Sequence, residues 1–463
     1  MERLAASFRD PSGFVFEHDG ILYRYIARDY AEHYTQLMSG GLYDDLVAAQ
    51  LLVPHAEVAT PHPAAAGAFR IIAPTRVDFV SYPYEWCFGQ LRAAALCTLA
   101  VARRALARGM LLKDASAFNV QFDGAHPVFI DTLSFERYVE GTPWPAYRQF
   151  CEHFLAPLLL MAHVAPDLSR LLRVYPDGLP LGLASRLLGW RAPLSVSAWV
   201  HLRLHSRSIA RGEAAQEPPS KPAAVSRRGL ESLLEHLEEA VSGCRWQPAG
   251  TVWADYDRTH SYSTAAFEAK REIVDRCVRA AGARRIWDLG ANTGTFSRIA
   301  ADAGAKVLSL DADAAAVELN FRRVAERTDR NVLPLLVDLT NPTPPLGWAL
   351  RERASLPERG PAGMALALAL VHHLAIGHNL SFAQIAGFFR RLAPAVLVEF
   401  VPKDDPMVQR LLAARRDIFP DYTEAAFVAA LEREFPAVER QALPESERVL
   451  FFARAGARKG AGA

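Results

Sequence analysis

The sequence has 463 residues, of which 51% are hydrophobic and 22% are charged, and this composition excludes an extensively disordered chain. Because this length exceeds what a single hydrophobic core usually organises, we expect more than one domain. Lysine plus arginine (52) nearly balances aspartate plus glutamate (51), which disfavours nucleic acid as a partner.

The N-terminal segment MERLAASFRD lacks the apolar core of a secretory signal. The most hydrophobic runs, 154–165 and 364–374, are shorter than the roughly 20 residues that cross a bilayer. They are typical of a buried helix and a buried strand. The cysteines show no paired metal-ligand spacing, which favours reduced, buried thiols. We therefore predict a cytoplasmic protein with no membrane partner and no metal site.

Residues 1–204 contain a pattern of polar residues in MLLKDASAFNVQFDGAHPVFIDTLSFE. Asp114 precedes Asn119 by five positions, and Asp131 follows twelve positions later at the end of an apolar strand. This spacing resembles the catalytic loop and metal-binding aspartate of protein kinases and aminoglycoside-type phosphotransferases. The resemblance implies a base, an amide and a carboxylate that converge on one phosphate group.

The same region departs from the kinase pattern. Asp131 is followed by Thr-Leu instead of Phe-Gly, no glycine-rich phosphate loop lies upstream, and Arg24 is the nearest stand-in for the missing strand lysine. We expect residues 1–204 to form an α+β domain, with a degenerate kinase-like fold as one interpretation. A regulatory or substrate-presenting role is favoured, and an active phosphotransferase remains the alternative.

A linker is predicted over residues 205–228, where the chain is polar, rich in proline and alanine, and free of aromatic residues. A helix follows at 230–241. We place a second domain at 229–456 and a flexible tail at 457–463.

Short apolar segments alternate with amphipathic ones in the second domain, which predicts parallel βαβ units in an α/β sheet covered on both faces. The last strand follows a polar turn, PESER, and is expected to enter antiparallel. The predicted strands are 285–289, 306–310, 332–336, 364–370, 396–400 and 449–453. The predicted helices between them include 296–303 and 314–327.

Ligands bind to such sheets outside the carboxyl ends of the strands, so the loop after the first strand, DLGANTGTF, is the place to look. Gly290 lets the backbone turn sharply, Asn292 can adopt a left-handed conformation, and Gly294 opens the next helix where a side chain would collide with a ligand. Asp288 closes the strand. Asp311 ends the second strand, 23 positions after Asp288, where a carboxylate can accept hydrogen bonds from both hydroxyls of a ribose.

This order of strand, glycine loop, helix, strand and acid resembles class I S-adenosylmethionine-dependent methyltransferases over 253–454. Asn292 stands where the commoner motif has a middle glycine. The resemblance implies a Rossmann-like, seven-stranded sheet with helices on both faces and S-adenosylmethionine as the cofactor. It implies cofactor-binding roles as follows: the methionine part beside Gly290 and Gly294, the amino group near Asp288, the ribose on Asp311, and the adenine amino group on Asp338. Upstream, Tyr256 and Tyr262 could close over the cofactor as a lid, or they could be core contacts of an N-terminal helix.

Other ligands of this fold remain alternatives. A nicotinamide-dependent dehydrogenase needs the pattern G-x-G-x-x-G, whereas this loop has only Gly290 and Gly294. A non-catalytic, nucleotide-binding scaffold would share the fold without the chemistry.

His372 and His373 follow the fourth strand, across the expected crevice from the glycine loop. A histidine there could remove a proton from a hydroxyl, amine or carboxyl acceptor, or it could only pack or cap the next helix. Glu399, Lys403 and Asp405, after the fifth strand, could bind a polar acceptor or belong to a solvated loop. The expected activity is methyl transfer to a small molecule or a protein, in preference to nucleic acid.

Overall fold

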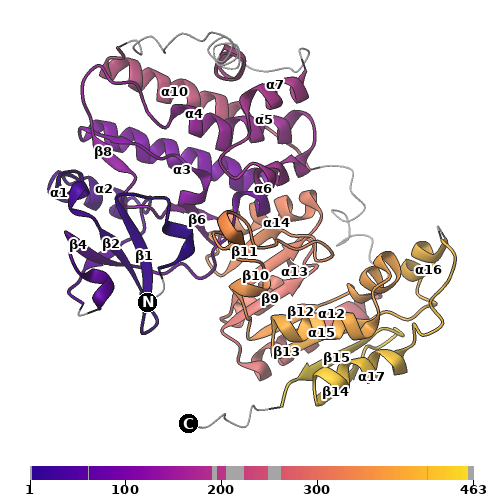
Figure 1. Cartoon of the computed structure of the whole chain (residues 1–463). Helices are drawn as coiled ribbons and strands as arrows, with labels where there is room; N and C mark the ends of the chain where they lie inside the picture. Colours follow the sequence, from indigo (N-terminus) through magenta and orange to yellow (C-terminus); the bar gives the residue numbers. More distant parts are fainter. Residues whose placement is uncertain are drawn as a thin grey trace. The chain divides into compact units, whose positions relative to one another are not determined.

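The computed structural model describes residues 3–60, 62–189, 196–204, 224–248, 262–413 and 415–456. The chain divides into two compact units: unit 1 is Met1–Gln247 with Pro345–Arg353, and unit 2 is Pro248–Pro344 with Ala354–Ala463 (Figure 1). Most of the expected linker, the expected tail and Tyr256 lie outside the described residues.

Unit 1 begins with a four-stranded antiparallel sheet in the order β1-β2-β4-β3, followed by helices and two small strand pairs. The strands are β1 (Gly13–His18), β2 (Ile21–Ile26), β3 (His55–Glu57), β4 (Arg70–Pro74), β5 (Met110–Leu112), β6 (Val120–Asp123), β7 (His126–Phe129) and β8 (Phe135–Arg137). The α-helices are α1 (Ala31–Ser39), α2 (Leu42–Ala48), α3 (Phe88–Ala107), α4 (Tyr147–Phe150), α5 (Ala156–His163), α6 (Leu171–Val174), α7 (Leu181–Leu188), α8 (Val196–Trp199) and α10 (Arg227–Gly243), and π-helical turns continue α4 and α8.

The helix α10 belongs to unit 1, whereas the sequence placed the start of the second domain at residue 229. Its leucine face, including Leu230, Leu234 and Leu237, is buried, and it packs along α3. The guanidinium of Arg92 on α3 also donates to the last carbonyls of α10. A polar, proline-rich segment indicates a connection, but it does not indicate which core the following amphipathic helix will join.

Unit 2 is built on a seven-stranded sheet in the order β11-β10-β9-β12-β13-β15-β14. Its strands are β9 (Arg285–Leu289), β10 (Lys306–Asp311), β11 (Val332–Leu336), β12 (Met364–Ala367), β13 (Ala395–Phe400), β14 (Ala437–Ala442) and β15 (Val449–Arg454). Its helices are α12 (Thr264–Ala281), α13 (Thr295–Asp302), α14 (Ala314–Glu326), α15 (Phe382–Leu392), α16 (Pro406–Ala413) and α17 (Glu424–Glu434), with a π-helical turn at His373–Gly377.

The strands from β9 to β13 are parallel, and β15 runs antiparallel between β13 and β14. Nearly every residue of β9, β11, β12 and β13 is buried, so helices must cover both faces of the sheet. The chain leaves β9 in one direction towards β10 and β11, and it later adds β12 on the opposite side of β9. This reversal creates a crevice between β9 and β12 at their carboxyl ends.

No helix among the described residues has the length and apolar content that a bilayer crossing requires. The five cysteines are all buried and unpaired by disulfides, as their spacing predicted.

Candidate functional site

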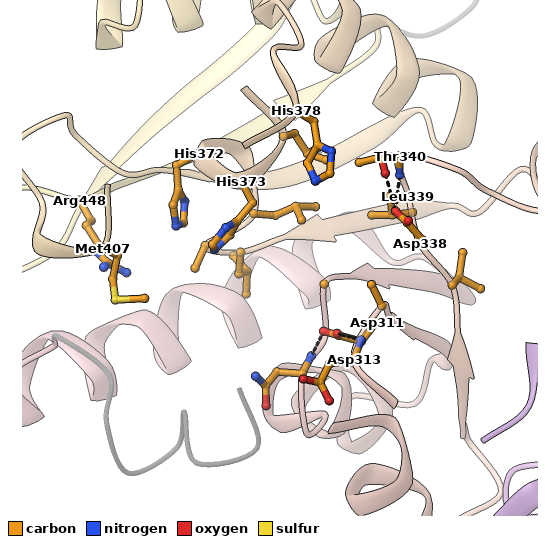
Figure 2. Close-up of a pocket in the computed structure, with 18 residues that line it drawn as sticks. Asp311, Asp313, Asp338, Leu339, Thr340, His372, His373, His378, Met407 and Arg448 are labelled. Carbon is orange, nitrogen blue, oxygen red and sulfur yellow. Dashed lines mark hydrogen bonds between the residues drawn. The ribbon is translucent and has the colours of Figure 1, made fainter. Parts of the chain in front are cut away.

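A cavity of about 440 Å³ opens at the carboxyl ends of the central strands of unit 2. Its walls come from the segments that follow β9, β10, β11 and β12, together with side chains from α16 and the turn before β15 (Figure 2). The lining residues are Gly290, Asn292, Asp311, Ala312, Asp313, Val337, Asp338, Leu339, Thr340, Leu368, Ala369, Leu370, His372, His373, Leu374, His378, Met407 and Arg448.

The glycine loop after β9 forms one wall of this cavity. Gly290, Asn292 and Gly294 all have left-handed backbones, with φ of 76°, 50° and 79°. At Gly290, a Cβ atom would lie 3.2 Å from Cδ1 of Leu370 on the opposite wall, so a side chain there would narrow the crevice. The expected left-handed conformation of Asn292 is therefore confirmed.

Gly294 is required for a different reason from the one the sequence suggested. Gly294 is not among the described residues that line the cavity. A Cβ atom there would lie 2.2 Å from Oδ1 of Asn320. Asn320 is buried on α14 and donates to Ser309 on β10. The glycine thus makes room for packing between α14 and the start of α13.

Asp311 lies at the tip of β10 and borders the cavity. Its two carboxylate oxygens accept hydrogen bonds from the backbone N–H groups of Asn292 (2.7 Å) and Asp313 (2.9 Å). Burial raises the pKa of Asp311 to about 6, even though these hydrogen bonds favour its ionised form. Together with a backbone hydrogen bond from Ala312, these contacts fix the carboxylate at the crevice, and its remaining lone-pair capacity can take a further donor.

Asp288 is buried behind the glycine loop and is not among the described residues that line the cavity. Its Oδ2 accepts a hydrogen bond of 2.6 Å from the hydroxyl of Ser297, which in turn contacts the hydroxyl of Ser309. Burial raises the pKa of Asp288 to about 6. This carboxylate therefore links β9 to α13 and supports the loop from behind, and it does not point into the crevice.

Asp338 follows β11 and lines the cavity beside Leu339 and Thr340 (Figure 2). Its Oδ1 accepts hydrogen bonds from the backbone N–H of Thr340 (2.8 Å) and from its hydroxyl (2.6 Å). The turn therefore presents a carboxylate that is held in one orientation.

His372 and His373 lie at the mouth of β12, and their ring centroids are 4.1 Å apart. Figure 2 shows both rings between Asp311 on one side and Met407 with Arg448 on the other. His372 is almost fully buried, and within the described residues its Nδ1 atom has no hydrogen-bond partner. Burial lowers the pKa of both imidazoles, to about 4 for His373, so both rings are neutral at pH 7.

Tyr262 lies in a buried polar network and is not among the described residues that line the cavity. Its hydroxyl donates to Glu399 and accepts from Lys270 (2.8 Å) and Arg448 (2.7 Å). Arg448 also forms two hydrogen bonds, of 2.7 and 3.0 Å, with the carboxylate of Asp405. Glu399 lies within β13 and is fully buried, and Asp405 is paired with Arg448, so neither belongs to a solvated loop.

The sequence did not single out Arg448 and Met407 as part of this site. Arg448 immediately precedes β15, and Met407 lies on α16. Both are far along the chain from the glycine loop, and no local pattern marks them. Asp313 was also missed, although an aspartate that caps a helix is recognisable: its Oδ1 accepts from the backbone N–H groups of Ala315 and Ala316.

In unit 1 the kinase-like residues are occupied by partners within the protein. The guanidinium of Arg24 on β2 lies 2.8 Å from Oδ1 of Asp131 and 2.6 Å from Oδ2 of Asp10. The other oxygen of Asp131 accepts from the hydroxyl of Ser134. Asp131 therefore already has a cationic partner where the kinase resemblance implies a metal ion.

Asp114 also has partners nearby. Its Oδ1 accepts from the backbone N–H of Ser116 (2.9 Å) and from the side chain of Gln149 (2.8 Å), and burial raises its pKa. The amide of Asn119 points towards Ser134 at 3.4 Å. The predicted residues are thus neighbours in space, but the described contacts do not direct them to a common ligand.

Comparison with known proteins gives one relative along the whole chain. The nodulation protein NoeA of Rhizobium meliloti (strain 1021) is 35% identical over 457 residues, which covers 97% of this chain and 95% of the relative. No family model matches the sequence.

Solved structures similar to parts of this chain include two methyltransferases. Magnesium protoporphyrin IX methyltransferase (ChlM) from Synechocystis PCC 6803, with bound S-adenosylhomocysteine, is 17% identical, with 44% of this chain and 92% of that chain covered and a TM-score of 0.32. The bifunctional kinase-methyltransferase WbdD is 15% identical, with a TM-score of 0.31. The match covers 46% of this chain and 45% of WbdD, which is less than half of each. The identity with NoeA extends over both units, and the chain belongs to the family of this nodulation protein.

Proposed function

We propose that unit 2 is an S-adenosylmethionine-dependent methyltransferase. The observation that supports this proposal is the cavity at the point where the strand order reverses, with Gly290 after β9 and Asp311 after β10 on its walls. A carboxylate at that position can accept hydrogen bonds from the ribose, and the left-handed loop beside it leaves space for the rest of the nucleoside.

The residues at the two ends of the cavity suit the two ends of the cofactor. Asp338 would accept a hydrogen bond from the adenine amino group, with Leu339 beside the ring, while Gly290 and Leu370 would flank the methionine part. When bound, the cofactor supplies a methyl group on a positively charged sulfur, which is already activated for transfer.

The residues of the chain would then orient the acceptor and remove its proton. The buried Nδ1 of His372 has no partner among the described residues, and it can accept a proton as the acceptor attacks the methyl group. Because burial keeps the pKa of this imidazole well below 6.5, the ring is in its basic form at neutral pH. We propose a small molecule or a protein as the acceptor, in line with the balanced charge of the chain.

Calorimetric titration with S-adenosylhomocysteine tests the proposal. The wild-type protein should bind it, and Asp311→Ala should weaken binding by about 10- to 100-fold, because the ribose loses a charged hydrogen-bond acceptor. Asp302→Ala, which removes an exposed carboxylate from α13, should bind normally. His372→Ala should retain the affinity and lose methyl transfer to an identified acceptor. Equal affinity of wild type and Asp311→Ala would refute the ribose assignment, and binding of NADH instead would favour the dehydrogenase.

For unit 1 we propose a non-catalytic role, either regulatory or in presenting a substrate, within a degenerate kinase-like fold. The pairing of Arg24 with Asp131 supports this proposal, because a divalent cation would first have to displace a buried guanidinium. An active phosphotransferase would instead show magnesium-dependent binding of ATP.

A further inference from the structure

A buried ion pair lies behind the cavity wall of unit 2. The ammonium group of Lys270 on α12 is 2.7 Å from Oε2 of Glu399 at the end of β13, and both side chains are almost inaccessible, with 2% and 0% exposure. The hydroxyl of Tyr262 contacts both charged groups. Within this network, attraction by Lys270 and Arg448 keeps the pKa of Glu399 low, although burial alone would raise it.

The same carboxylate also holds a strained residue. Oε2 of Glu399 accepts a hydrogen bond of 2.8 Å from the backbone N–H of Ala369, just beyond the tip of β12. Ala369 has a φ of 50°, in the left-handed region that alanine rarely adopts. Such a conformation persists only where the surrounding structure holds it. Glu399 provides the only side-chain hydrogen bond described for Ala369.

The held segment forms the wall of the cofactor cavity. Ala369 and Leu370 both line the cavity, and the Leu370 side chain lies against Gly290 on the opposite wall. His372 follows Leu370 by two positions in the chain. The conformation of Ala369 therefore sets where Leu370 and His372 stand relative to the glycine loop.

A buried ion pair is weak evidence for stability, since an apolar pair of the same size is often at least as stable. We propose that Glu399 is a positioning residue: through its hydrogen bond to Ala369 it fixes the wall that receives the amino-acid part of S-adenosylmethionine. This inference rests on the proposed methyltransferase function.

Two charge-matched double variants isolate the hydrogen bond. Lys270→Met with Glu399→Gln removes both charges and keeps an oxygen that can accept from the Ala369 N–H. Lys270→Met with Glu399→Met removes the same charges and also the acceptor. Calorimetry with two probes then separates the parts of the cofactor. S-adenosylhomocysteine carries the amino-acid part, and 5′-methylthioadenosine lacks it.

The glutamine double variant should bind both probes within about threefold of wild type. The methionine double variant should lose about tenfold in affinity for S-adenosylhomocysteine, the effect of one hydrogen bond, and keep its affinity for 5′-methylthioadenosine. A merely structural role for Glu399 would weaken binding of both probes alike, and that result would overturn the inference, as would equal binding by the two variants. If wild type binds neither probe, the proposed function itself fails.

Discussion

Some residues in this protein have more than one structural role, and Asp311 is the clearest example. Its carboxylate fastens the glycine loop through Asn292 and the start of α14 through Asp313, and it also borders the cavity. Serine or asparagine could satisfy one of these N–H groups, but a carboxylate accepts from both and still has lone-pair capacity for a further hydroxyl donor.

The raised pKa of Asp311 predicts a pH dependence of cofactor binding. In the proposed complex the ribose hydroxyls would donate to the ionised carboxylate, so binding would lower this pKa, and affinity should reach its full value above about pH 6. As pH falls below about 6, a proton must be lost on binding, and affinity for S-adenosylhomocysteine should fall by up to about tenfold per pH unit. Titrations at about pH 5 and about pH 7.5, roughly one unit or more below and above this pKa, would measure the change in affinity.

Two variants assign the effect. The pKa of Asp288 is also raised to about 6, so Asp288→Asn should leave the fall in affinity in place. Asp311→Asn should bind more weakly, with the same affinity at both pH values. If Asp288→Asn instead abolishes the pH dependence, the titrating group has been misassigned.

At the scale of elements, the guanidinium of Arg24 ties β2 to the segment between β7 and β8. It is mostly buried, with 13% exposure, and it pairs with both Asp10 and Asp131. Removing one partner of a buried ion pair leaves an uncompensated charge, whereas removing both partners leaves a neutral site.

We therefore expect Arg24→Met to destabilise unit 1 by about 3 kcal/mol or more. Arg24→Met combined with Asp131→Asn should recover part of this loss, and a double-mutant cycle in urea would give the coupling energy. Arg76→Met is a suitable control, because the salt bridge of Arg76 with Glu17 is largely exposed, and its loss should change stability by less than about 1 kcal/mol. A cost for Arg24→Met as small as that of the control would show that the pair is not a structural tie.

The elements that could be predicted from the sequence are those whose apolar pattern is enforced by burial on both faces. The strands β9 and β11 have the predicted bounds, and β13 and β15 differ by a residue at one end. The strand β12 ends at Ala367 and not at Leu370, because the backbone turns through the left-handed Ala369.

The strand β14 was not predicted. Its sequence, AVERQA, is polar, and most of its residues are exposed because it forms the edge of the sheet. Its strand character comes from pairing with β15, which is a long-range interaction. The residues of the site differ in the same way. Gly290 and Asp311 could be predicted from the order of motifs along the chain, whereas Arg448 is brought to the cavity only by the tertiary fold.

At the scale of the whole molecule, each unit has its own buried core, so the units are expected to unfold as separate cooperative transitions. A ligand that binds one unit should raise only the transition of that unit. S-adenosylhomocysteine at 100 times its dissociation constant should stabilise unit 2 by about 2.7 kcal/mol and leave the other transition unchanged.

Differential scanning calorimetry, with and without the ligand, would measure this. Magnesium with ATP should move neither transition, since Arg24 already neutralises Asp131. A rise in the transition of unit 1 with magnesium and ATP would restore the phosphotransferase as an active function.

The assignment of Pro345–Arg353 to unit 1 has a consequence for how such a protein can be inherited or recombined. The carboxylate of Glu352 in this segment accepts hydrogen bonds from Arg9, near the start of the chain. A gene exchange with a single crossover after Gln247 would replace unit 2 and, with it, the segment that holds Glu352, so Arg9 would meet a foreign partner. Descent along this lineage should therefore keep both halves together, as the identity with NoeA along nearly the full length of both proteins already suggests.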